Sequence, residues 1–168
     1  MKKDKDDDMS RGSWERVDRF IALFLRSGSI AMMVALVVFV AAGVVVRFLP
    51  FASMGWADEI IELAFAWLVF LGAAALWRDR THFRVDLLPL RLGNSKAGLR
   101  LGIGLALLAL GFFLVFTYQG GWVSYKATDR SPILELPRYL WYMVMPLSGA
   151  IIIGYTIRDL WKVLRERS

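Results

Sequence analysis

Four long stretches of this 168-residue chain are almost free of Asp, Glu, Lys and Arg. The longest, 101–125, has 25 residues, and the shortest, 60–77, has 18 and contains one charged residue, Glu62. A helix rises about 1.5 Å per residue, so about 20 apolar residues cross the ~30 Å hydrocarbon core of a bilayer. A soluble helix would show a polar face every three or four residues and barrel strands would alternate, and these stretches do neither. We therefore predict an all-α membrane protein with four transmembrane helices, at about 27–47, 58–77, 99–125 and 138–158.

Aromatic and proline residues refine these boundaries. Of the seven tryptophans, only Trp67 lies deep inside a stretch, and the others lie at or near the ends. Amphipathic rings prefer the headgroup region, so this placement is typical of an aromatic belt, although large aromatic side chains also pack in ordinary cores. Ser131-Pro132 has the pattern of a helix start, and Pro146 predicts a kink inside the last span.

Basic residues lie mostly on one side of the predicted membrane. Seventeen of the 21 Lys and Arg lie before the first span, in the loop between the second and third spans, or after the fourth span. Loops rich in Lys and Arg stay in the cytoplasm, so we predict that both termini and the loop between the second and third spans are cytoplasmic. The membrane topology alone explains these basic loops, and we expect no nucleic-acid partner.

The N-terminal region differs from the rest. Residues 1–9 form a mixed-charge tail that we expect to be disordered, and 27–168 form the four-helix transmembrane domain. Between them, 10–26 has apolar residues at helical spacing with charges interleaved, which predicts an amphipathic helix lying on the cytoplasmic membrane surface. The alternative is that 10–26 simply extends the first span.

Cations and one tryptophan near the cytoplasmic surface are candidate anchors to anionic phospholipid, since each Lys or Arg near such a surface adds about 1 kcal/mol of attraction. These residues are Trp14, Arg16, Arg19, Arg78, Arg80 and Arg84. His82 lies among the arginines, and a lone histidine beside cations is a poor metal ligand. With no cysteine, one histidine and no P-loop, we expect no metal, no cofactor and no ATP hydrolysis.

A small polar cluster lies at the predicted outer end of the second span. Its members are Arg47, Trp56, Asp58, Glu59 and Glu62, which we regard as a candidate interface for a partner. The alternative is structural, because acids stabilise a helix N-terminus and Glu62 could pair with Arg47. The apolar stretches of spans one, three and four, at 27–46, 101–125 and 139–157, contain no Asp, Glu, Lys or Arg, and buried charges usually mark solute paths. We therefore expect that the chain does not carry a charged solute by itself.

Two blocks of residues resemble a known family. The first contains Arg47-Phe48, Trp56-x-Asp58-Glu59, the run 67–73, Arg78 and the run 82–88, and the second contains 131–139 with Pro146. Together with the length and the four spans, they resemble the small membrane subunit of tripartite ATP-independent periplasmic (TRAP) transporters, the DctQ-like family. The resemblance covers about 14–165, and the family's usual Arg-Tyr pair stands here as Arg47-Phe48.

The resemblance implies a function. A DctQ-like chain would be a multi-pass protein of the bacterial inner membrane that is not an enzyme. It would scaffold a large membrane subunit that imports an organic acid, such as a carboxylate or sialic acid, with sodium, after delivery by a periplasmic binding protein. Two alternatives from the residues alone are a self-sufficient oligomeric carrier or channel, and a membrane enzyme or enzyme anchor using His82, Asp79 and Asp86.

Overall fold

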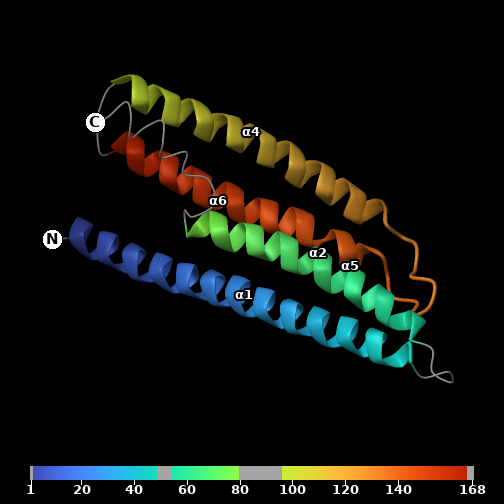
Figure 1. The fold of residues 1–168 in the computed structure, drawn as a ribbon. Helices are drawn as coiled ribbons and strands as arrows, with labels where there is room; N and C mark the ends of the chain where they lie inside the picture. The colour runs from blue at the N-terminus through green and yellow to red at the C-terminus, as the bar shows by residue number, and fades with distance from the viewer. Residues whose placement is uncertain (1, 49–53, 80–95, 166–168) are drawn as a thin grey trace.

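The computed structural model describes residues 2–48, 54–79 and 96–165, with side chains for 16–48, 54–79, 101–161 and 165. The described part is helical, and its elements are α1 (Lys2–Val46), α2 (Gly55–Arg78), α4 (Lys96–Lys126), α5 (Tyr139–Tyr142) and α6 (Val144–Arg165) (Figure 1). Among the described residues, four segments are long and apolar enough to cross a membrane: Arg16–Val46, Gly55–Arg78, Leu101–Lys126 and Tyr139–Trp161. The predicted all-α class with four spans is confirmed. The ends of the second, third and fourth spans lie close to those expected, whereas the first apolar segment begins at Arg16 and not at 27.

The helices lie side by side in the order α1, α2, α6, α4, with α5 continuing the line of α6 (Figure 1). Helix α1 packs along α2, α2 also contacts α5 and α6, and α6 packs on α4. The eight-residue interval 47–54 between α1 and α2 is short, so these two helices are antiparallel neighbours. The longer 79–95 interval allows α4 to lie on the far side of α6.

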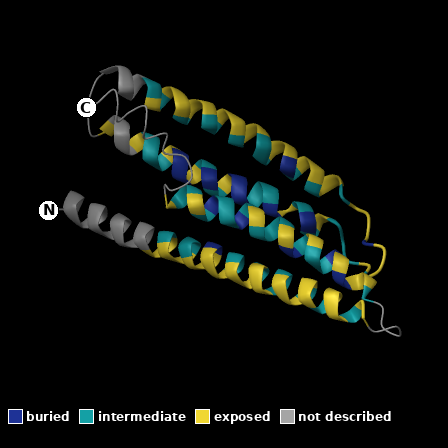
Figure 2. Ribbon diagram, viewed as in Figure 1, coloured by how far each residue is buried: buried dark blue, intermediate teal, exposed yellow. Residues whose placement is uncertain are grey.

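Apolar side chains of three helices meet in the core. Leu25 of α1, Leu71 and Ala74 of α2, and Val144 and Ile152 of α6 are buried together. Outside this core, many large apolar side chains of α1 and α4 are exposed (Figure 2). Each of these outer helices has protein on only one side, and lipid would cover the rest, so this exposure is expected of a membrane protein.

Helix α1 is continuous through the boundary that the sequence predicts between 10–26 and the first span. Leu25, from the segment expected at the membrane surface, is completely buried in the core, and Ile21 packs against the same cluster. The helix also includes residues 2–9, for which the sequence predicts disorder. Interfacial and spanning helices share the same 3.6-residue periodicity, so the pattern alone does not separate them. The surface position of 10–26 stays a prediction.

The last span contains the break that Pro146 predicts. α5 ends at Tyr142, Met143 is outside both helices, and α6 begins at Val144. Proline has no N–H, so it cannot donate to the Tyr142 carbonyl one turn earlier, and its ring crowds that carbonyl. The interruption therefore appears within the turn that precedes the proline.

Candidate partner interface

The predicted partner cluster lies where the end of α1 and the start of α2 meet, and the exposed surface there is called the rim (Figure 1). Arg47, Asp58 and Glu62 are exposed there, and Trp56 is partly exposed with its ring edge-on to Phe39, centroids 5.8 Å apart. Among the described residues, no ion pair joins Arg47 to Glu62, so the expected pairing is not formed. Asp58 lies in the first turn of α2, where an acid interacts favourably with the helix dipole.

Glu59 differs from its neighbour Asp58 because it is buried. Its two carboxylate oxygens accept hydrogen bonds from the backbone N–H groups of Ile133 and Leu134, at 2.9 and 3.0 Å. Consecutive helical residues point about 100° apart, so one acid faces the solvent and the next faces the bundle. The carboxylate of Glu59 therefore holds the α4–α5 loop against α2 and is not presented on the rim.

The α4–α5 loop is a compact hairpin. Ser131 donates its backbone N–H to the Leu136 carbonyl at 2.8 Å, and its hydroxyl accepts from the Leu136 N–H at 3.1 Å. The Arg138 N–H donates to the Asp129 carbonyl at 2.9 Å. Glu135 has a φ of 52°, in the left-handed region that reverses the chain. Ser131-Pro132 thus starts a single turn over 132–134, and the expected helix start is wrong because Ser131 caps the hairpin instead.

At the opposite end of the bundle, three helices share one carboxylate. Asp18 of α1 accepts from Arg78 of α2 at 2.6 Å (Nη2) and 3.3 Å (Nε), and from the Tyr155 hydroxyl of α6 at 2.8 Å. Arg158 lies 3.6 Å from the same carboxylate. Arg78 is about one-quarter exposed, so water screens the pair only partly. This cluster, Asp18, Arg78, Tyr155 and Arg158, fixes the relative positions of α1, α2 and α6.

The predicted phospholipid anchors take different positions. Arg16 and Arg19 are exposed on α1, whereas Arg78 is engaged by Asp18. The side chain of Trp14 and all of Arg80, His82 and Arg84 lie outside the described part of the chain, so their roles stay predictions. No sequence pattern singled out Asp18, Tyr155 or Arg158, because their partners are distant in the chain.

Two tryptophans also hold α2 to the last span. Trp67 donates its indole N–H to the Leu140 carbonyl at 2.9 Å, beside the break before Pro146. Trp77 donates to the Thr156 hydroxyl at 3.0 Å, and that hydroxyl donates to the Ile152 carbonyl. Buried indole N–H groups need such partners. These contacts, together with those of Glu59 and Asp18, join α2 to α1, α5, α6 and the α4–α5 loop.

Comparison with known proteins identifies the chain. The family model for the DctQ component of tripartite ATP-independent periplasmic transporters matches residues 16–166, which is most of the sequence. The chain belongs to this family. The resemblance seen in the sequence is thereby confirmed, and the match starts close to the beginning of the first membrane-spanning segment, Arg16–Val46.

Individual relatives of this DctQ-family chain agree with that assignment. The C4-dicarboxylate TRAP transporter small permease protein DctQ of Rhodobacter capsulatus is 32% identical over 102 residues, covering 60% of this chain and 45% of that protein. An uncharacterized protein, y4mM, of Sinorhizobium fredii is 27% identical over 153 residues, covering 90% and 28%. The isethionate TRAP transporter permease protein DctMQ of Oleidesulfovibrio alaskensis is 27% identical over 113 residues, covering 65% and 18%. The chain spans less than half the length of each of these relatives.

Proposed function

We propose that this TRAP small permease subunit is the fixed scaffold of a larger transporter. In this proposal a large membrane subunit carries an organic acid into the cell with sodium, and a periplasmic binding protein delivers that acid. The chain lies in the bacterial inner membrane with both termini in the cytoplasm. The proposed transported compound is an organic acid, either a carboxylate or a sialic-acid-like molecule; of these, the name of the Rhodobacter relative supports a carboxylate.

The placement of charge supports a scaffold rather than a carrier. The apolar stretches of spans one, three and four, at 27–46, 101–125 and 139–157, contain no Asp, Glu, Lys or Arg. Asp18 and the two arginines that contact it, Arg78 and Arg158, lie near the ends of the membrane-spanning segments and join three helices together. A carrier of charged solutes needs charged or polar ligands near the middle of the membrane, and a scaffold needs helices that do not move apart.

The DctMQ relative supports a membrane partner. The matched region is 18% of that protein, so most of its length is additional polypeptide in the same chain. We propose that the present chain binds a separate large subunit in the lipid plane. The exposed rim residues Arg47, Trp56, Asp58 and Glu62 are proposed to contact the periplasmic binding protein, whereas Glu59 is excluded because its carboxylate is engaged inside the chain.

Copurification and reconstituted transport test the proposal. The full chain, tagged and extracted in mild detergent, should bring down a much larger hydrophobic protein. Proteoliposomes should take up an organic acid only when the chain, that partner and the binding protein are combined under a sodium gradient. Uptake by the chain alone would refute the scaffold role and would favour a self-sufficient oligomeric carrier.

The rim is tested separately by charge reversal. Asp58→Lys combined with Glu62→Lys should lower uptake at limiting binding-protein concentration. The two substitutions reverse the charge of the rim and would remove its electrostatic complementarity to the binding protein. Arg26→Glu, an exposed position on α1 away from the rim and outside the predicted lipid anchors, serves as the control. Unchanged uptake in the rim variant would remove these residues from the docking surface without affecting the scaffold proposal.

A further inference from the structure

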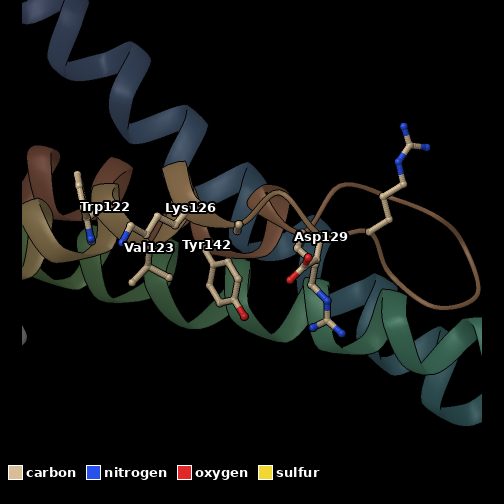
Figure 3. A pocket seen from close by; sticks show the side chains of 8 residues that line it. Trp122, Val123, Lys126, Asp129 and Tyr142 are labelled. Carbon is tan, nitrogen blue, oxygen red and sulfur yellow. The ribbon is translucent and has the colours of Figure 1, made fainter.

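A hollow of about 470 Å³ lies where α4 ends and α5 begins (Figure 3). Trp122, Val123 and Lys126 line it from α4, and Tyr142 faces it from α5. The Lys126 amine lies 4.7 Å from the centre of the Trp122 ring, which places a cation on an aromatic face. The lining therefore combines an apolar wall with a positive charge.

The charge of this hollow is strongly unbalanced. Lys126, Arg130 and Arg138 line it together with a single acid, Asp129. Within the described structure, none of these three cations is part of an ion pair. The buried Glu59 beside the same loop interacts electrostatically with Arg138 and partly offsets its charge, but Glu59 does not line the hollow. The hollow therefore offers positive charge to a ligand from outside the chain.

The hollow lies at the level where the membrane ends. The third span ends at Lys126 and the fourth begins at Tyr139, so the cations stand at headgroup depth. Towards the membrane interior, Val115 and Tyr118 lie on the same face of α4 as Trp122, and they are 62% and 70% exposed. A molecule that places an anion among the cations thus meets an exposed apolar helix face directly beside it.

We propose that this hollow binds the phosphate of an anionic phospholipid. The headgroup oxygens lie among Lys126, Arg130 and Arg138, the glycerol lies against Trp122, and one acyl chain follows the Val115–Tyr118 face of α4. The apolar face favours a lipid over a soluble anion or an acidic protein surface, which would need no such extension into the bilayer. The binding depends on the four-span arrangement and not on the proposed transport function.

Native mass spectrometry of the full chain, with any partner that copurifies, tests the site. The protein in detergent is titrated with phosphatidylglycerol, and separately with phosphatidylcholine of the same acyl chains and with inorganic phosphate. Lys126→Gln should weaken phosphatidylglycerol binding about fivefold, and adding Arg130→Gln should weaken it about 25-fold, from ~1 kcal/mol per cation. The matched control is Arg47→Gln, which removes one exposed cation away from the hollow and should change binding less than twofold.

Three results would overturn the proposal. One is equal loss with Arg47→Gln and Lys126→Gln, which would mean that only net charge matters. Another is equal binding of phosphatidylcholine, which would remove the need for an anion. The third is displacement of the lipid by an equal concentration of inorganic phosphate, which would indicate a soluble-anion site. Lys126→Arg should keep wild-type binding, and far-UV circular dichroism confirms that each variant is folded.

Discussion

The contact between α4 and α6 allows a sharp test of the packing. Gly149 on α6 faces Thr117 on α4, and a methyl group added at Gly149 would overlap the Thr117 hydroxyl oxygen. The same methyl would lie 3.3 Å from the Thr117 Cβ and 3.5 Å from a ring carbon of Phe116. The Thr117 hydroxyl can rotate, but its Cβ is attached directly to the α4 backbone and cannot turn away, so Gly149→Ala should push the two helices apart.

Gly154, five residues further along α6, is the matched control, because an added methyl there meets no atom within 4 Å. Overpacking a well-packed contact costs about 1–3 kcal/mol. The same change adds helix propensity, worth up to about 1 kcal/mol in water. We therefore expect Gly154→Ala to be neutral or stabilising, and Gly149→Ala to be less stable than Gly154→Ala by about 1–3 kcal/mol.

The assay is unfolding of the full chain by SDS in mixed micelles, followed by far-UV circular dichroism. Thr117→Ala should rescue Gly149→Ala, because it removes the overlapping oxygen, which is buried and has no hydrogen-bond partner among the described residues. Equal stability of the two glycine variants, or failure of the double variant to regain stability, would refute the close approach of α4 and α6.

Three further outcomes follow from the polar contacts and the helix break. Asp18→Asn should lower the free energy of unfolding by about 1–2 kcal/mol in the same SDS assay, because Arg78 loses its charged acceptor; this value is reduced for the partial exposure of the pair. An equal loss of stability in Asp159→Asn would contradict this. Glu59→Gln should loosen the α4–α5 hairpin, measured as faster hydrogen exchange at the Ile133 amide, with no change in exchange within α1. Pro146→Ala should restore an N–H donor and close the helix break, so that amide protection becomes continuous through it; an unchanged break would assign it to tertiary packing.

Much of the architecture was predictable because a transmembrane span depends on the length and hydropathy of one contiguous segment. The predicted second span, 58–77, lies within the observed helix Gly55–Arg78, since a run of apolar residues is a property of the segment itself. The break before Pro146 was predictable for the same reason, because it needs only the missing N–H. By contrast, the Ser131-Pro132 pattern predicted a helix start, but the structure has a turn there within a hairpin that Glu59 of α2 holds in place.

The candidate site could be predicted only in part. Asp58 and Glu59 are adjacent acids that look equivalent in sequence, yet one is exposed and the other holds a loop 74 residues away. Arg78 reads as a surface cation, but Asp18, 60 residues earlier, engages it. A charge pattern gives the residues available for pairing and leaves open which of them meet, because that depends on the order of the helices.

The sequence by itself determined that this chain crosses a membrane four times and belongs with TRAP small subunits, because hydropathy and motifs are properties of contiguous residues. The tertiary structure alone decided the helix order α1, α2, α6, α4 and the continuity of α1 past Leu25. It also decided that side chains of α2 bond to α1, α5, α6 and the α4–α5 loop. It also created the basic hollow, whose cations come from both sides of one loop. The physical reason is that close packing and charge pairing join residues far apart in the chain, and only a folded arrangement brings them within contact distance.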